Sequence, residues 1–136
     1  MSFVNEYISE ADIEKYGIKE IDEKFNKGHY KPHWTIDRER NIYLRYLYNE
    51  REEHSNRHTY YFYWKGFSVI VIVDIDGGGV MNGEQWRHYN MWRFEIPESI
   101  KPQEREVIGD LKHAFVIYKE AGVLSDSTKH TATFDF

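Results

Sequence analysis

The sequence predicts an α+β domain built on an antiparallel sheet of about five or six strands, with two short N-terminal helices and one long C-terminal helix packed on it. Three observations carry this prediction. An unbroken run of β-branched and aromatic residues extends from His58 to Asp76. Helical patterns precede the strand-like segments and follow them. The length of 136 residues suits one core, so 1–136 is expected to be a single domain.

The run from His58 to Asp76 predicts the central β-hairpin of the fold. Its turn is the dipeptide Lys65-Gly66, because glycine tolerates the positive φ that two-residue turns require. Side chains alternate along a strand, so this turn places six of them on one side of the sheet as the opposed pairs Trp64–Phe67, Phe62–Val69 and Tyr60–Val71. The other side receives Tyr61, Tyr63, Ser68, Ile70 and Ile72. Both sides are largely apolar, which favours a central position with a layer packed on each face.

Two short amphipathic helices are expected before the strands. Ser9 and Asp12 have the spacing of a capping box, which predicts a helix beginning near Glu10. A second helix is predicted over Ile18–Lys27, ending at Gly28. Both should cover one face of the sheet.

The other elements are predicted from alternation, helical periodicity and the positions of proline and glycine. In chain order they are a short strand at Trp34–Ile36, a turn at Asp37–Asn41, a long strand at Ile42–Tyr48, a charged loop at Asn49–Arg57, a flexible connection at 77–85, a strand at Met91–Ile96, a helix at Pro102–Ala121 and a final strand at Lys129–Phe136.

Composition limits the classes of function. The net charge is −5, and no basic stripe of the kind that binds nucleic acid is visible. The absence of cysteine excludes disulfides and thiolate metal sites. No signal-peptide pattern opens the sequence, and the longest apolar run, Val69–Val73, is too short to cross a bilayer. These features predict a soluble, cytoplasmic protein that binds neither nucleic acid nor membrane.

Two patterns resemble metal sites, and both are incomplete. The segment Asp74–Gln85 has acids at positions 1 and 3 of a calcium loop, but it ends in glutamine and follows a strand rather than a helix. Histidines spaced by four residues occur as His29/His33 and His54/His58, without a third ligand. We therefore expect no metal and no cofactor.

No arrangement of residues indicates catalysis. The run Asp37-Arg38-Glu39-Arg40 offers an acid beside a phosphate clamp, but such runs are more often turns whose charges pair with one another. The motifs of serine hydrolases and phosphate-binding loops are missing, and there is no cysteine nucleophile. The sequence therefore favours a protein that is not an enzyme.

Three strings in the first half of the chain suggest a family. They are FVNEYI at Phe3–Ile8, WTIDRER at Trp34–Arg40 and YFYWKG at Tyr61–Gly66. Together they resemble small bacterial immunity proteins of polymorphic toxin and contact-dependent growth-inhibition systems. The resemblance implies an inhibitor that binds a cognate toxin domain, often a nuclease, and blocks its active site. It implies no catalytic residues.

Two surfaces are candidates for binding such a toxin. One is formed by the acidic N-terminal helices, because residues 1–25 hold seven acids against three lysines. The other is formed by the loops 49–57 and 77–90, which combine acids with aromatic anchors of the kind found at interface hot spots. The loops are preferred, and their predicted partner-binding residues are Glu50, Glu52, Glu53, Glu84, Trp86 and Tyr89.

Two alternatives to an immunity protein remain open. The first is a small enzyme or ligand-binding protein with a pocket on the sheet lined by tyrosine, histidine and arginine. The second is a structural module of a larger assembly.

Overall fold

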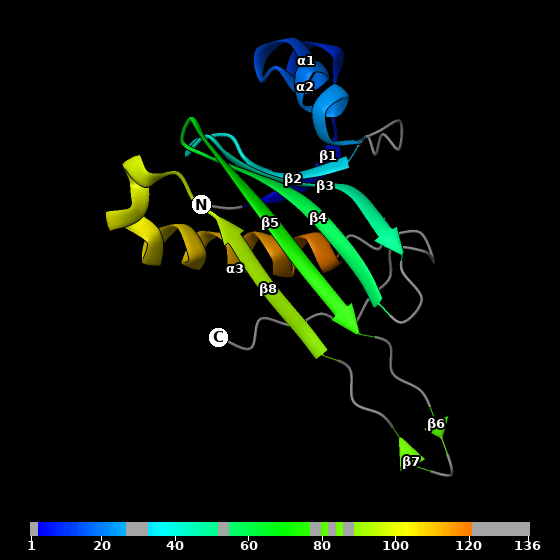
Figure 1. Ribbon diagram of the computed structural model, residues 1–136. Helices are drawn as coiled ribbons and strands as arrows, with labels where there is room; N and C mark the ends of the chain where they lie inside the picture. Colours follow the sequence, from blue (N-terminus) through cyan, green and yellow to red (C-terminus); the bar gives the residue numbers. More distant parts are fainter. Residues whose placement is uncertain are drawn as a thin grey trace.

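The computed structural model describes residues 3–26, 33–51, 55–76, 80–81, 84–85 and 89–120. Six antiparallel strands form one sheet in the order β1-β2-β3-β4-β5-β8 (Figure 1). Their bounds are Val4–Tyr7 (β1), His33–Asp37 (β2), Ile42–Arg51 (β3), Ser55–Trp64 (β4), Phe67–Asp76 (β5) and Tyr89–Glu95 (β8). The predicted α+β fold class is confirmed.

The predicted hairpin is formed by β4 and β5, with the predicted register. Trp64 pairs with Phe67, Phe62 with Val69 and Tyr60 with Val71. The turn residues Lys65 and Gly66 both have positive φ, 49° and 92°, as a tight hairpin turn requires. The hairpin lies inside the sheet, between β3 and β8.

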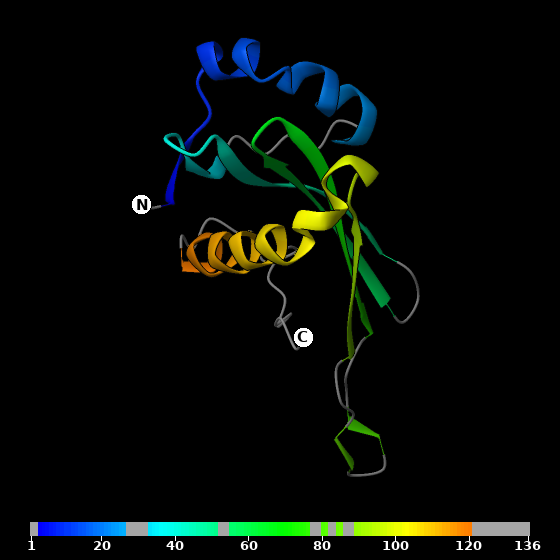
Figure 2. The same ribbon diagram turned by 90° about the vertical axis from the view of Figure 1, so that its left-hand side faces the viewer.

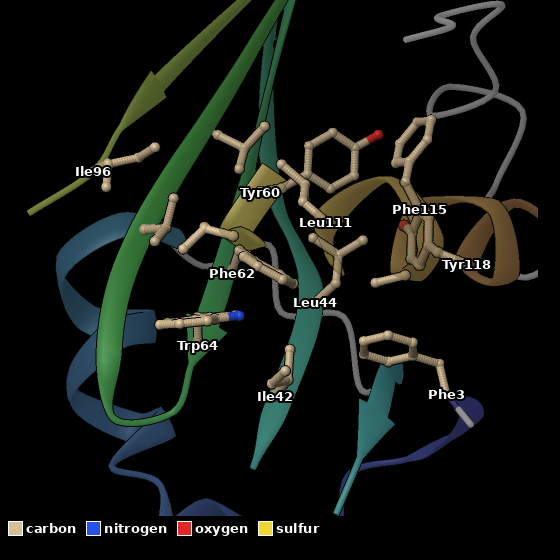
Figure 3. Close-up of a cluster of buried hydrophobic side chains, with 14 of the residues drawn as sticks. Phe3, Ile42, Leu44, Tyr60, Phe62, Trp64, Ile96, Leu111, Phe115 and Tyr118 are labelled. Atoms are coloured by element: carbon tan, nitrogen blue, oxygen red, sulfur yellow. The ribbon is translucent and has the colours of Figure 1, made fainter. Parts of the chain in front are cut away.

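A separate apolar cluster covers each face of the sheet. We call the first the α3 face, because the long helix α3 (Glu104–Glu120) packs there against Leu44, Phe62 and Val71. Figure 3 shows Leu111, Phe115 and Tyr118 of this helix directed at the strands. The second we call the α1 face, because the N-terminal helices lie on it over a cluster that contains Trp34, Tyr43 and Tyr61. Figure 2 shows the two helical layers on opposite sides of the strands.

The N-terminal helices begin as predicted. α1 (Glu10–Lys15) has a complete capping box between Ser9 and Asp12. α2 (Ile18–Ile21) continues as one turn of π-helix at Asp22–Asn26 rather than as an α-helix. The predicted end at Gly28 lies outside the described residues.

The segment 49–57 differs from the prediction of a loop. β3 continues to Arg51 and β4 begins at Ser55, so the prediction was wrong for the described residues on either side of 52–54. The polar residues pair across strands, Glu50 with Arg57 and Arg51 with Asn56. Backbone pairing with a long neighbouring strand decides the conformation here, although the composition lacks strand periodicity.

Three further features of the strands differ from the predictions. Val80–Met81 (β6) and Glu84–Gln85 (β7) pair as a small two-stranded sheet within the connection that was expected to be flexible. β8 begins two residues before the predicted Met91. β1, a short edge strand, was not predicted.

The C-terminal helix also begins later than predicted. A 3-10 helix, η2 (Glu98–Gln103), contains Pro102, and α3 follows it from Glu104. The apolar stripe of α3 is buried as expected, through Val107, Leu111, Ala114 and Tyr118. The predicted strand 129–136 lies outside the described residues. Across the described ranges, no helix combines the length and apolar character needed to cross a membrane.

Candidate partner-binding end of the sheet

The topology brings the two predicted binding loops to the same end of the sheet. β3 ends at Arg51 where β4 begins, and β5 ends at Asp76 where β8 begins. Ser55 of β4 pairs with Asp76, and Asp76 pairs with Tyr89, so the strand ends are level. We call this the distal end. Figures 1 and 2 show β6 and β7 projecting beyond it, away from the helices.

The structure places three of the six predicted binding residues. Glu50 is exposed in β3, near the distal end. Glu84 lies in β7 of the projecting hairpin, and Tyr89 is the first residue of β8. Glu52, Glu53 and Trp86 lie outside the described residues. The distal end therefore gathers the elements that carry Glu50 and Tyr89, while Glu84 lies further out.

A cross-strand ion pair at the distal end was missed in the sequence. Arg57 Nε donates to Asp74 Oδ1 over 2.7 Å, with 44% and 29% of the two side chains exposed. Glu50 is opposite Arg57, and Met91, 65% exposed, is opposite Asp74. Arg57 and Asp74 are equally far from the Lys65-Gly66 turn, so extending the predicted register would have found the pair. It was missed because 49–57 was assigned to a loop.

The same ion pair involves the first acid of the calcium pattern. Asp74 and Asp76 are residues of β5, and the carboxylate of Asp74 is directed to Arg57. Of the histidine pairs, the structure describes one member each: His33 contacts the ring of Tyr7, and His58 is buried beside Tyr46. His29 and His54 lie outside the described residues. No group of three potential ligands suited to a metal ion occurs among the described residues.

A buried arginine lies beneath the N-terminal helices. Arg45 is fully buried on the α1 face, and its Nη2 donates to Asp22 Oδ1 over 2.6 Å. Because Asp22 belongs to the π-helical turn and Arg45 to β3, this ion pair joins the helical layer to the sheet. Buried charges require such a partner to offset the loss of hydration.

Tyrosines surround this arginine. Tyr43 and Tyr63 stack with ring centroids 5.0 Å apart, and the Tyr61 hydroxyl is 2.6 Å from Ser68 Oγ. Burial raises the pKa of Tyr43 and of Tyr61, so both remain protonated donors. Two buried polar atoms, Trp34 Nε1 and Tyr43 Oη, have no hydrogen-bond partner within the described ranges. Tyrosines and one arginine are therefore packed together in the buried layer of the α1 face.

The run Asp37–Arg40 joins layers instead of pairing only within itself. Arg40 Nε donates to Asp37 Oδ2 over 2.7 Å, and its Nη1 donates to Asp110 of α3 over 2.8 Å. Burial raises the pKa of Asp37, but the hydrogen bonds from Arg40 outweigh this and leave the pKa lowered. Trp64 Nε1 donates to the other oxygen of Asp110.

The neighbouring arginine serves the opposite layer. Arg38 donates to Asp12 in α1 and to Glu6 in β1. Its hydrogen bond lowers the pKa of Asp12 against the effect of burial, and the two carboxylates raise the pKa of Arg38. The charges of Arg38 and Arg40 are therefore used in structural contacts, which argues against a phosphate clamp at this turn.

Comparisons of the chain with protein-family models, with curated proteins and with solved structures found no match.

Proposed function

We propose that this protein is an immunity protein, which binds a cognate toxin domain, a nuclease in particular, and blocks its active site. The family resemblance of the three strings in the first half of the chain motivates the proposal. The observation that carries it is the distal end, where β3, β4, β5 and β8 have level ends and the β6–β7 hairpin projects from a sheet covered by helices on both faces (Figures 1 and 2). A projecting element on a packed scaffold suits insertion into the concave site of an enzyme.

Charge supports the same proposal. The net charge of −5 complements a nuclease, whose surface must be basic to hold phosphates. Complementary charge accelerates encounter more than it strengthens the final complex. At the distal end this attraction would come from the exposed Glu50 and from Glu52 and Glu53, which are predicted to bind the partner.

The experiment expresses the toxin gene adjacent to this gene in cells, with and without the protein, and measures survival. We expect rescue, and we expect a stable complex of the two purified proteins. Equal death in both cultures would end the immunity proposal.

Matched charge reversals then locate the contact. Glu52→Lys with Glu53→Lys at the distal end is compared with Glu14→Lys and Glu23→Lys, two exposed residues of the N-terminal helices. Both double variants change the net charge equally. The distal variant should slow association and reduce its salt dependence, while the other should not. If only the variant in the N-terminal helices slows association, the contact is assigned to those helices instead.

A tryptophan truncation tests the anchor. Trp86→Ala should mainly accelerate dissociation, by a factor of about thirty, if this side chain fills a pocket in the toxin. An unchanged dissociation rate would remove Trp86 from the interface.

One observation favours a second candidate function, the binding of a small ligand on the α1 face. Trp34 Nε1 and Tyr43 Oη are buried hydrogen-bond donors without partners within the described ranges, and Arg45 lies in the same layer. Native mass spectrometry of the protein purified from its own host tests this candidate. A bound small molecule that is lost in Tyr43→Phe would support it, and a spectrum of the bare chain would count against it.

A further inference from the structure

One outer strand of the sheet has an edge with which no other described strand pairs. β8 pairs with β5 from Ile70↔Glu95 to Asp76↔Tyr89 and ends the strand order. In Figure 2 the other edge of β8 faces the viewer, and no described element lies along it. Such an edge presents backbone donors and acceptors to any strand of suitable sequence.

The side chains of β8 alternate between the two faces. Met91, Arg93 and Glu95 are exposed on the α1 face. Trp92 and Phe94 pack on the α3 face, where Trp92 contacts Phe115 with ring centroids 5.3 Å apart. The strand therefore carries an apolar row on one face and two opposite charges, two residues apart, on the other.

These two charges have no ion-pair partner in the described part of the chain. Every salt bridge of the described residues involves other side chains, although Arg93 and Glu95 are both exposed. Natural edges often carry charge of one sign, which repels a second copy of the same strand. An Arg and a Glu on the same face have the opposite consequence, because an antiparallel copy brings unlike charges together.

We propose that two copies of this protein associate through β8, forming a continuous antiparallel sheet across a two-fold axis at Phe94. This register places Arg93 of each copy opposite Glu95 of the other, so the interface contains two ion pairs. On the α3 face it places Phe94 opposite Phe94 and Trp92 opposite Ile96. Both rows are thus complementary. The proposal is independent of the toxin-binding function.

The neighbouring registers are less favourable. An axis at Arg93 would place the two arginines opposite each other. An axis at Trp92 would place Arg93 opposite Met91 and leave Glu95 without a charge partner. A shift by a single residue would turn the apolar row of one copy to the charged face of the other. The opposite edge of the sheet, β1, is shorter, and its Glu6 already binds Arg38.

Sedimentation velocity over a wide range of protein concentration tests the association. The wild-type protein should dimerise, and the dimer should weaken with added salt, because the ion pairs are exposed. Arg93→Glu and Glu95→Arg should each weaken self-association about tenfold or more, since each places like charges opposite one another twice. Arg105→Glu, an exposed arginine on α3, is the matched control and should leave the dimer unchanged.

Mixing the two variants gives the decisive measurement. A chain with Arg93→Glu and a chain with Glu95→Arg form two restored ion pairs only with each other, so the mixture should form heterodimers. The double variant Arg93→Glu/Glu95→Arg should again form homodimers. Circular dichroism confirms that each variant is folded.

Three outcomes would overturn the proposal. They are a wild-type protein that stays monomeric at every concentration, a dimer that both single variants leave intact, and a mixture that fails to associate. A wild-type monomer that uses β8 to bind an extended segment of another protein would assign the edge to that partner instead.

Discussion

Asp12 shows how one buried carboxylate serves two structures. It completes the capping box by accepting from the backbone N–H of Ser9 and from its hydroxyl, at 3.2 and 2.8 Å. It also accepts from Arg38, which follows β2. The residue therefore fixes the start of α1 and attaches this helix to the sheet.

The pH dependence of stability should report this residue. The pKa of Asp12 is lowered in the folded protein, chiefly by Arg38, relative to about 3.9 in the unfolded chain. Its contribution is therefore fully present above the unfolded pKa and is lost as the pH falls through the folded pKa. Asp12→Asn should lower the free energy of unfolding by about 1–3 kcal/mol at neutral pH, and by less in acid.

Urea denaturation at a series of pH values measures this difference. Glu14→Gln, on the exposed side of α1, is the control and should have little effect at any pH. A cost of Asp12→Asn that stays the same down to strongly acidic pH would show that its ionisation does not stabilise the fold.

The turn between β2 and β3 connects the sheet to both helical layers. Arg38 holds α1, and Arg40 reaches Asp110 of α3. Because Asp110 also accepts from Trp64 Nε1 over 2.8 Å, a single side chain attaches this helix to the turn and to β4. Apolar contacts supply most of the packing, while these polar bonds fix the position of α3 along the sheet.

Truncation of Asp110 should therefore be costly. Asp110→Ala leaves the indole N–H of Trp64 without its acceptor and should lower the free energy of unfolding by about 2–3 kcal/mol. The control is Glu106→Ala, one turn earlier, whose ion pair with Lys65 spans 3.7 Å between side chains 56% and 42% exposed. That pair should contribute less than about 1 kcal/mol. Equal losses in chemical denaturation would contradict this account.

At the scale of the molecule, the described residues are organised around the six-stranded sheet, which two apolar clusters share. Each cluster packs against the same central strands, β3 and β4, from opposite sides. Loss of either helical layer would expose apolar residues of strands on which the other layer depends. Folding of the two faces should therefore be coupled, as expected of a single domain.

Two buried tryptophans report on the two faces separately. Trp34 lies on the α1 face and Trp64 on the α3 face. In protein labelled with 5-fluorotryptophan, their fluorine resonances, assigned by Trp34→Phe and Trp64→Phe, should disappear at the same urea concentration. Earlier loss of the Trp34 signal would show that the N-terminal helices unfold as a separate unit.

Local sequence patterns were sufficient to predict several elements. The β4–β5 register followed from one turn dipeptide and strict alternation, because a two-residue loop leaves a single way to pair the strands. The capping box of α1 followed from two residues three apart. The stripe of α3 followed from helical periodicity, although the 3-10 turn at Pro102 was not foreseen.

The candidate site was harder to predict, because it depends on pairing over long distances in the sequence. Composition alone was enough to select the segments 49–57 and 77–90 as candidates for binding. That they come together at the distal end could be known only from the strand order. The exposed pair Arg57–Asp74 was hidden in a segment whose polar composition resembles a loop. Such residues adopt a strand when neighbouring strands satisfy their backbone groups.

The sequence by itself established the α+β class, the central hairpin and the positions of the helices, since each depends on contacts between residues close in the chain. Tertiary structure was needed to place β1 beside β2, to bury Arg45 against Asp22 and to leave the outer edge of β8 unpaired within the described residues. Each of these three features depends on the order of the strands and on how the layers pack. The physical reason is that a residue's neighbours across a sheet are set by the pairing of whole strands, which a local pattern does not contain.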